Sequence, residues 1–284
     1  MRRLLQACAA ALALMAMPAA AQDSGFSRPG AVAHLSQDAA IAFSKQIEVE
    51  LAQQGARVAI VFRTGRARDQ LPEGISYTHG AFWVYQNIQT ADGAVIPGYA
   101  VYNLYHGEGE NRTRSYLAQD FPLDFVAGSA VDDVAVIVPT PEMQRRILGV
   151  MGSPTYTALH VPDYALVANP YDPRFQNCNE FMLDVIASAA WETTDYAQIK
   201  ANLREHYRAT RVRVSGLQRL VGPMMDERLR TSDHRRGRIE TATYESMAAF
   251  MTQHGLARRT YVLQRDPAFV FAGDAQRAGS SAQP

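Results

Sequence analysis

The amino-acid sequence predicts an α+β protein in which an antiparallel sheet packs against helices. Two β-rich segments, residues 75–88 and 94–105, flank Asp92-Gly93, and an Asp-Gly pair between such segments is a strong hairpin signal. Apolar residues recur every three or four positions over residues 38–54 and again over residues 178–189, as they do on the buried side of a helix. Together these patterns support the α+β class.

The first 21 residues have the pattern of a secretory signal peptide. Arg2 and Arg3 precede an apolar segment over residues 4–17, and three alanines at 19–21 allow cleavage after Ala21. The apolar segment is too short for a lasting transmembrane helix. We therefore expect a periplasmic or secreted protein with no stable membrane anchor.

Charge balance restricts the function classes. Two of the 28 basic residues leave with the signal peptide and all 28 acidic residues remain, so the formal net charge becomes −2. This balance argues against a nucleic-acid partner. We expect the arginine-rich run at 228–238 to be a solvated loop or helix face, not an anion site.

The first elements of the mature chain follow from apolar spacing and turn residues. Residues 22–54 form an N-terminal segment whose helix over 38–54 ends at Gly55, a residue suited to a helix C-terminus. Residues 57–62 are β-rich and predict a strand. The charged stretch at 64–74 contains proline and glycine, which indicate a loop.

The register of the hairpin decides which polar side chains meet. If Asp92 and Gly93 form a two-residue turn, facing residues have numbers that sum to 185, so His79 lies opposite His106 on the same face. A three-residue loop or a bulge shifts the pairing by one residue and exchanges His106 for Asn103. We prefer the two-residue turn and keep the second register as the alternative.

The rest of the chain alternates loops and short elements. Residues 152–176 are rich in proline and tyrosine, which indicates a packed loop of fixed shape. One domain over residues 55–270 would contain a helical insertion at 195–254, and the small, polar residues 271–284 predict a disordered tail. The other predicted elements are helices at 114–119, 141–151, 196–207, 216–229 and 243–254 and strands at 133–138 and 258–264.

Cys178 is the single cysteine of the mature chain, because Cys8 lies in the signal peptide. Asn177 is a favoured N-cap residue and Glu180 follows it by three positions, as in a capping box. The N-terminus of a helix favours a thiolate and can donate to an oxyanion. A lone exported thiol is an intermolecular bridge, a reactive group or a buried small residue. Its place at a helix start favours the reactive role.

Two short motifs resemble a known superfamily. Residues 76–81, Ser-Tyr-Thr-His-Gly-Ala, and residues 177–181, Asn-Cys-Asn-Glu-Phe, are similar to motifs of the permuted relatives of NlpC-type cysteine peptidases, in which the histidine precedes the cysteine. More narrowly, Tyr164 with Asn169-Pro170 and residues 175–179 resembles an uncharacterised family of bacterial exported proteins, domain of unknown function 2145. This narrower resemblance covers about residues 55–265.

The resemblance implies a permuted papain-like core, with the sheet packed on the Cys178 helix and extra helices at both ends. It implies Cys178 as nucleophile and His79 as general base. The orienting group would be His106, with Asn103 as the alternative. Further residues would line the substrate cleft, namely Asn177, Asn179, Tyr164, Trp83 and His160.

The leading functional hypothesis is an exported cysteine hydrolase or amidase that acts on an amide or acyl bond, with peptidoglycan peptide as the substrate class that the resemblance implies. One alternative is acyl transfer or thioester cleavage on the same scaffold. A second is a non-catalytic periplasmic binding or assembly protein, in which Cys178 is only a small residue at a helix start. No cofactor is expected, and no metal, because residues 106–108 lack a second Cys/His pair at ligand spacing.

Overall fold

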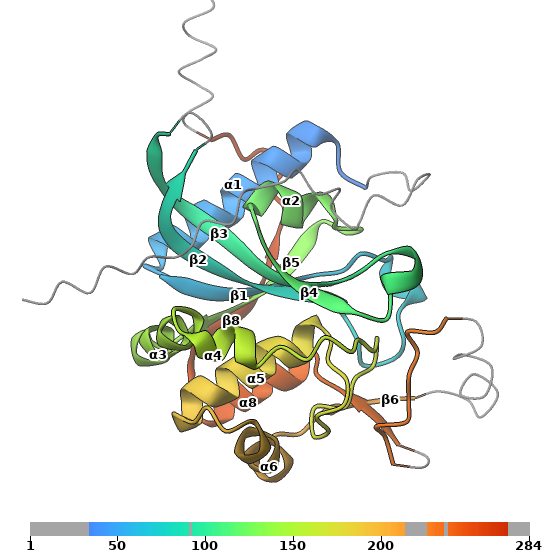
Figure 1. The fold of residues 1–284 in the computed structure, drawn as a ribbon. Coiled ribbons are helices and arrows are strands. Elements are labelled where there is room, and N and C mark those ends of the chain that lie inside the picture. Colours follow the sequence, from blue (N-terminus) through green and yellow to red (C-terminus); the bar gives the residue numbers. More distant parts are fainter. Residues whose placement is uncertain (1–33, 91–92, 214–225, 236–237, 272–284) are drawn as a thin grey trace, which may run out of the picture.

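The computed structural model describes residues 34–90, 93–213, 226–235 and 238–271 (Figure 1). The predicted signal peptide, most of the predicted helix at 216–229 and all but the first residue of the predicted tail lie outside them. A six-stranded antiparallel sheet, ordered β4-β3-β2-β1-β5-β8, forms the centre. Its strands are β1 (Val58–Arg63), β2 (His79–Gln89), β3 (Val95–His106), β4 (Ser115–Asp120), β5 (Asp133–Pro139) and β8 (Ala257–Gln264).

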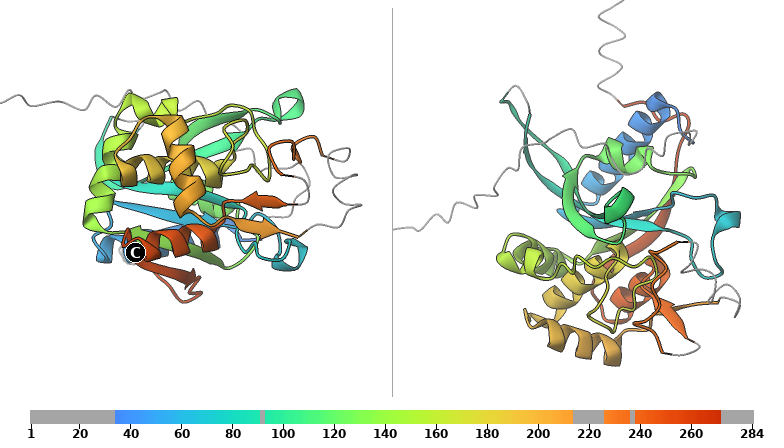
Figure 2. Two further views of the ribbon diagram at one scale, coloured as in Figure 1. Left: turned by 90° about the horizontal axis from the view of Figure 1, so that it is seen from below. Right: turned by 45° about the vertical axis from the view of Figure 1, so that its right-hand side comes forward.

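Helices cover both faces of the sheet, which makes the protein α+β as predicted (Figures 1 and 2). One face carries α1 (Gln37–Gln53) and α2 (Pro122–Ala127). The opposite face carries α3 (Pro141–Met151), α4 (Pro154–Ala158), α5 (Cys178–Trp191), α6 (Tyr196–His206) and α8 (Tyr244–Gln253). A small second sheet pairs β6 (Thr210–Val212) with β7 (Ile239–Thr241), and two short 3-10 helices lie at Arg68–Gln70 and Gly109–Asn111.

The central strands supply two hydrophobic cores. Because side chains alternate between the faces of a strand, even-numbered residues of β2 such as Phe82 pack toward α5. Odd-numbered residues such as Ala81 and Trp83 pack toward α1 and α2. All six residues of β1 are buried, as expected for a strand covered on both sides.

Most locally signalled elements lie where the sequence predicts them. The predicted helix over 38–54 is α1, which begins after Ser36, whose hydroxyl accepts from the Ala39 N–H. Gly55 follows its C-cap with φ of +61°, a conformation that glycine adopts readily. The predicted elements at 57–62, 133–138, 141–151, 196–207, 243–254 and 258–264 correspond to β1, β5, α3, α6, α8 and β8.

The two-residue turn is wrong. Facing residues of β2 and β3 sum to 184, as in the pair Gln89 and Val95. The Thr90 N–H donates to the Ala94 carbonyl at 2.8 Å, so three residues separate the paired ends, and Gly93 has φ of +85°. The one-residue shift brings Asn103, not His106, to the face of His79.

Three other expectations fail where pairing between distant segments decides the structure. Residues 114–119 were predicted as a helix, but the edge of β3 draws residues 115–120 into strand β4, with Leu104 facing Leu117. Residues 226–229, the described end of the helix predicted at 216–229, form a turn. The predicted loop at 152–176 contains the short helix α4.

Candidate active site

Helix α5 carries Cys178 as its first residue. The Asn177 side chain accepts from the Glu180 N–H at 3.0 Å, as predicted for an N-cap. The Asn177 amide nitrogen donates to the Leu166 carbonyl, and that of Asn179 donates to the Ala242 carbonyl at 3.2 Å. The amide groups of both predicted cleft residues therefore tie the helix start to neighbouring loops.

The Cys178 sulfur lies against the peptide groups on both sides of His79. It lies 3.9 Å from the Thr78 carbonyl oxygen, and the Gly80 N–H on the other side of His79 lowers the pKa of the thiol. Side chains pack closely on Gly80, because a Cβ there would lie 2.3 Å from the Met182 Cε and 2.8 Å from the Phe62 ring. The residue is 6% exposed, so little of it reaches solvent.

The thiol occupies an opening in the sheet. The Tyr85 N–H donates to the Arg57 carbonyl on the β1 side, and backbone direction alternates along a strand, so the Gly80 N–H points toward β3. However, the pairing of β2 with β3 begins only at Phe82 and Tyr102. The Gly80 N–H therefore faces the Cys178 sulfur at a position where a continuous ladder would place a backbone carbonyl of β3.

His79 points toward α2, on the other face of the sheet. Its Nε2 lies 2.9 Å from the Asn103 Oδ1, and its ring stacks on Tyr105 with the centroids 5.3 Å apart. The Asn103 amide nitrogen donates to the Asp120 Oδ2 at 3.0 Å, so the amide oxygen faces His79. Because that oxygen only accepts, Nε2 carries the proton and Nδ1 is the basic nitrogen.

Cys178 and His79 come close through their backbones, and their side chains leave from different sides of β2. Among the residues that the structure describes, no hydrogen bond joins the thiol to the His79 ring. The sulfur lies beside the backbone of β2 on the side that faces β3. The backbone of β2 therefore separates the sulfur from the His79 ring. Hydrogen bonds between catalytic groups are often long or poorly aligned before substrate binds.

Burial controls the charge of both groups. It raises the pKa of the Cys178 thiol, against the N–H donors at the helix start and the nearby positive charge of Arg63, which lower it. The pKa of His79 is lowered to about 3, mainly by burial and also by the positive charge of Arg63. The helix start thus favours the thiolate, as expected, but the thiol and the imidazole are both neutral at neutral pH.

His106 lies apart from the Asn103 side chain. Its Nδ1 is 2.8 Å from the Gly107 carbonyl and its Nε2 is 3.1 Å from the Arg228 Nη1, so it does not orient His79. Its preference over Asn103 is wrong because it rested on the two-residue turn. Tyr164 is buried beside it, with the two ring centroids 5.2 Å apart.

The other predicted cleft residues have different surroundings. Trp83 is fully buried among the side chains between the sheet and α1 and α2, so its placement in a cleft is wrong. It lies on the face of His79 but farther along β2, where α2 covers the strand. The His160 Nε2 lies 2.9 Å from the Ser115 hydroxyl, and its ring packs on Phe181 of α5.

Three residues near His79, the buried Arg63 and Tyr105 and the half-buried Asp120, are absent from the sequence interpretation. Arg63 faces His79 across β1 and β2, donates to the Gly128 carbonyl and packs on the Phe125 ring. Asp120 accepts from Asn103 and, at 2.6 Å, from the Tyr105 hydroxyl. A sequence signal existed for Tyr105, which the three-residue loop places opposite His79.

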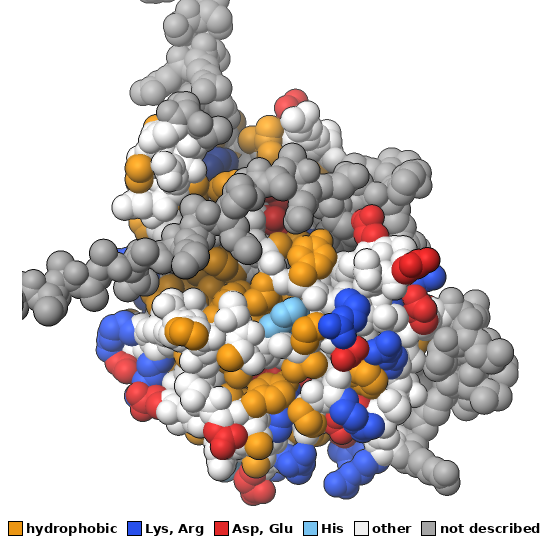
Figure 3. All heavy atoms as spheres, viewed as in Figure 1, with side chains coloured by type: hydrophobic (Ala, Val, Ile, Leu, Met, Phe, Trp, Pro, Cys, Tyr) orange, Lys and Arg blue, Asp and Glu red, His pale blue; other side chains and the backbone are white. Residues whose placement is uncertain are grey.

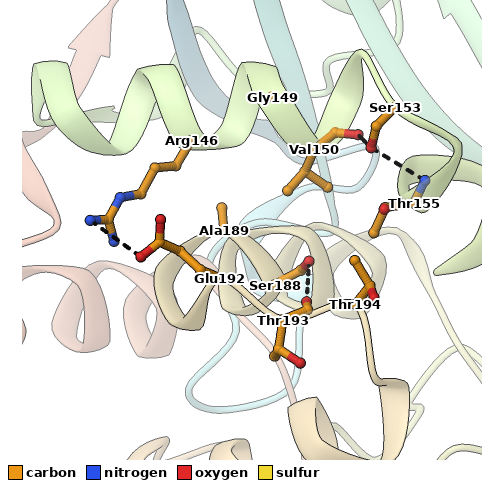
Figure 4. Close-up of a pocket in the computed structure, with 10 residues that line it drawn as sticks. All are labelled: Arg146, Gly149, Val150, Ser153, Thr155, Ser188, Ala189, Glu192, Thr193 and Thr194. Carbon is orange, nitrogen blue, oxygen red and sulfur yellow. Dashed lines mark hydrogen bonds and ion pairs between the residues drawn. The ribbon is translucent and has the colours of Figure 1, made fainter.

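Two surface pockets lie away from Cys178. Figure 4 shows a pocket of about 230 Å³ between α3 and α5, whose lining includes Arg146, Ser188 and Glu192. A second pocket of about 500 Å³ is lined by residues of both charges. Its basic residues are Arg174, Arg204, Arg208, Arg235 and Arg238, and its acidic residues are Asp172, Asp233 and Glu240. Figure 3 shows that basic side chains gather at the lower right of the face in view, with acidic side chains among them.

The arginine-rich run is less solvated than predicted. The Arg228 side chain is 13% exposed and pairs with Asp226. Arg230 packs on the Phe175 ring.

Within the described ranges, no group of three or more His, Cys, Asp or Glu side chains is arranged to hold a metal ion. None of the helices in those ranges combines the length and apolar composition needed to cross a membrane.

A profile of a protein family described as "Uncharacterized protein conserved in bacteria", domain of unknown function 2145, matches residues 50–251. The chain belongs to this family. The match confirms the narrower resemblance predicted from residues 164–179. The part that matches the domain of unknown function 2145 family contains Cys178, His79, Asn103 and Asp120, and it excludes β8. No curated protein and no solved structure matches the chain.

Proposed function

We propose that this protein is a cysteine hydrolase or amidase with a permuted papain-like active site formed by Cys178, His79 and Asn103. The observation that carries the proposal is the 2.9 Å contact between the His79 Nε2 and the Asn103 Oδ1, next to the peptide groups that contact the Cys178 sulfur. A cysteine at a helix start, a histidine and an orienting asparagine form the triad of papain-like proteases.

In the proposed reaction, His79 Nδ1 takes the thiol proton as the sulfur attacks a carbonyl carbon. The new C–S bond leaves a negative oxygen, which the N–H groups at the start of α5 can stabilise. His79 then gives its proton to the leaving amine or alcohol as its bond to carbon breaks. Water attacks the resulting thioester and gives up a proton to His79, which returns that proton to the sulfur as the C–S bond breaks and the acid is released.

The neutral resting state makes His79 a general base and not the partner of a preformed ion pair. Burial disfavours both the thiolate and the imidazolium. Reaction therefore requires the ring and the thiol to approach around the edge of β2 when substrate binds. Deprotonation would then accompany attack on the carbonyl, as in general-base catalysis.

The test is the rate at which iodoacetamide alkylates Cys178 in the native protein, measured from pH 5 to 10. His79→Ala should lower the rate near neutral pH by roughly a hundredfold or more, since a hundredfold is the lower end of the range for general-base catalysis. His106→Ala is the matched control, because this partly buried histidine does not contact Asn103, and its rate should equal that of the unmodified protein.

Equal rates in all three proteins would refute the proposed role of His79. Thermal unfolding of each variant shows whether a rate change reflects loss of the fold. An amine or alcohol acceptor added to a reaction with an acyl substrate would separate hydrolysis from acyl transfer, since only transfer yields the acceptor adduct.

One observation favours a non-catalytic alternative. The Cys178 residue is only 6% exposed and burial raises its pKa, as expected for a small apolar residue. In that case Cys178→Ser should leave the cellular phenotype unchanged, and alkylation should require denaturant.

For the catalytic function, we propose that the substrate is peptidoglycan peptide. We also propose that the protein acts in the periplasm after its signal peptide has been removed. Assaying periplasmic fractions for the chain truncated after Ala21 tests the location.

A further inference from the structure

A half-buried carboxylate holds Asn103 from the side opposite His79. Asp120 ends strand β4 and faces Val101 of β3. Its Oδ2 accepts from the Asn103 Nδ2 at 3.0 Å and from the Tyr105 hydroxyl at 2.6 Å. A continuous set of hydrogen bonds therefore runs from the His79 ring through the Asn103 amide to Asp120.

We propose that Asp120 is a positioning residue, which selects the orientation of the Asn103 amide and thereby the protonated nitrogen of His79. The inference rests on the proposed function for its consequence in catalysis. Its structural content, the tautomer of one histidine, can be measured without a substrate.

The orientation matters because the two ends of an amide have nearly the same shape but opposite hydrogen-bonding roles. With the oxygen toward His79, Nε2 must carry the proton and Nδ1 can accept one from the thiol. With the nitrogen of Asn103 toward His79, Nε2 would have to accept and Nδ1 would carry the proton. The ring could then no longer deprotonate Cys178 through Nδ1.

An ionised carboxylate only accepts hydrogen bonds, so Asp120 can bind only the nitrogen end of Asn103. Burial and the negative charge of Asp124 raise the pKa of Asp120 above its ordinary value, although the Tyr105 hydroxyl, the positive charge of Arg63 and the Asn103 amide each lower it. Arg63 is fully buried and Asp120 is half-buried, so solvent screens their attraction only in part. The Tyr105 hydroxyl, the Arg63 guanidinium and the Asn103 amide favour the acceptor form of Asp120.

The test combines nitrogen NMR of His79 in ¹⁵N-labelled protein with the alkylation rate of Cys178. The unmodified protein should show the proton on Nε2. Asp120→Ala should move His79 toward a mixture of tautomers and slow His79-dependent alkylation by roughly tenfold or more, because small displacements of a catalytic group have large effects. Asn103→Ala combined with Asp120→Ala should be no slower than Asn103→Ala alone, because Asp120 acts through Asn103.

Two variants separate positioning from a general structural effect. Asp120→Asn can keep both hydrogen bonds, because both end on a single oxygen, and should retain the Nε2 proton. Tyr105→Phe removes the other donor to that oxygen and should also retain it. If Asp120→Ala does not fold, Asp120→Ser, which is too short to reach Asn103, provides the same comparison.

An unchanged His79 tautomer in a folded Asp120→Ala or Asp120→Ser variant overturns the inference, whatever the alkylation rate. A changed tautomer supports it. Failure of the proposed function is read separately, from an alkylation rate that does not depend on His79. The two failures are therefore distinguishable.

Discussion

Lys200 is the buried charge that allows α5 and α6 to pack together. Its ammonium group donates to the Glu180 Oε1 at 2.9 Å and to both carboxylate oxygens of Asp184 at 2.8 and 2.9 Å. The Lys200 side chain is 4% exposed and the two acidic side chains are fully buried. Replacing Lys200 with Met preserves much of the volume but leaves both carboxylates without their counter-charge.

We expect Lys200→Met to lower the free energy of unfolding by about 3–5 kcal/mol at pH 7, the range for breaking a buried ion pair on one side. Lys45→Met is the matched control. Lys45 pairs with Glu48 at 2.9 Å, but its side chain is 40% exposed. Loss of such a solvated pair lowers the free energy of unfolding by about 0–1 kcal/mol.

The loss should shrink as pH falls. Burial raises the pKa of Glu180 and of Asp184 above their ordinary values, and Lys200 is the largest influence that lowers them. A carboxyl group whose folded pKa is raised stabilises the fold below its unfolded pKa, and this contribution is lost as pH rises through the folded pKa. Removing Lys200 raises both folded pKa values further, so protonation rescues the variant as pH falls from 7 toward the ordinary carboxyl range.

Urea unfolding of both variants and the unmodified protein, at pH 7 and at pH 5, measures these differences. The reasoning is refuted if Lys200→Met is no more destabilising than Lys45→Met. It is also refuted if the difference in free energy of unfolding between Lys200→Met and the unmodified protein is larger at pH 5 than at pH 7.

Two further predictions concern the start of α5 and its approach to the sheet. Gly80→Ala should lower the free energy of unfolding by about 1–3 kcal/mol, because its Cβ would meet Met182 and Phe62 below 3.0 Å. A Cβ added at Gly149 in α3 would have no atom within 4 Å, so Gly149→Ala should raise the free energy of unfolding by up to about 1 kcal/mol. Equal urea midpoints for the Gly80 and Gly149 variants would contradict the close approach of α5 to the sheet. Asn177→Ala should lower the free energy of unfolding by about 1–2 kcal/mol through loss of the N-cap, whereas Asn177→Asp should retain most of the stability of the unmodified protein. Equal stabilities of the two Asn177 variants in the same urea assay would exclude a capping role.

The sequence predicts elements well where the signal is local. Ser36, Gly55 and the apolar spacing between them mark α1, and Thr140-Pro141 marks the start of α3. Strand β4 was missed because its residues become a strand by pairing with β3. A helix prediction for the same residues has no means of seeing that partner, which lies nine or more residues away in the chain.

The candidate site divides in the same way. The sequence predicts Cys178 and His79 as candidate site residues because each lies in a short motif on a recognisable element. The choice between Asn103 and His106 depended on a single residue of loop length, which the Asp-Gly pair predicted wrongly. Asp120 could not be found once its strand had been missed, although it completes the hydrogen bonds that begin at His79.

Glu180 illustrates how a local pattern can be correct in form and wrong in partner. Its spacing from Asn177 predicted a capping box, and the Asn177 half of the box is present. The Glu180 carboxylate instead binds Lys200, twenty residues farther along the chain. A buried ammonium group needs an acceptor more than the N–H of an N-cap residue does, because an unpaired buried charge is far more unfavourable than an unpaired amide. The start of α5 is therefore held by the neutral Asn177 cap beside Cys178 and by the ion pair between Glu180 and Lys200 on the side of α6. Because Glu180 pairs with Lys200, its negative charge is directed away from the thiol.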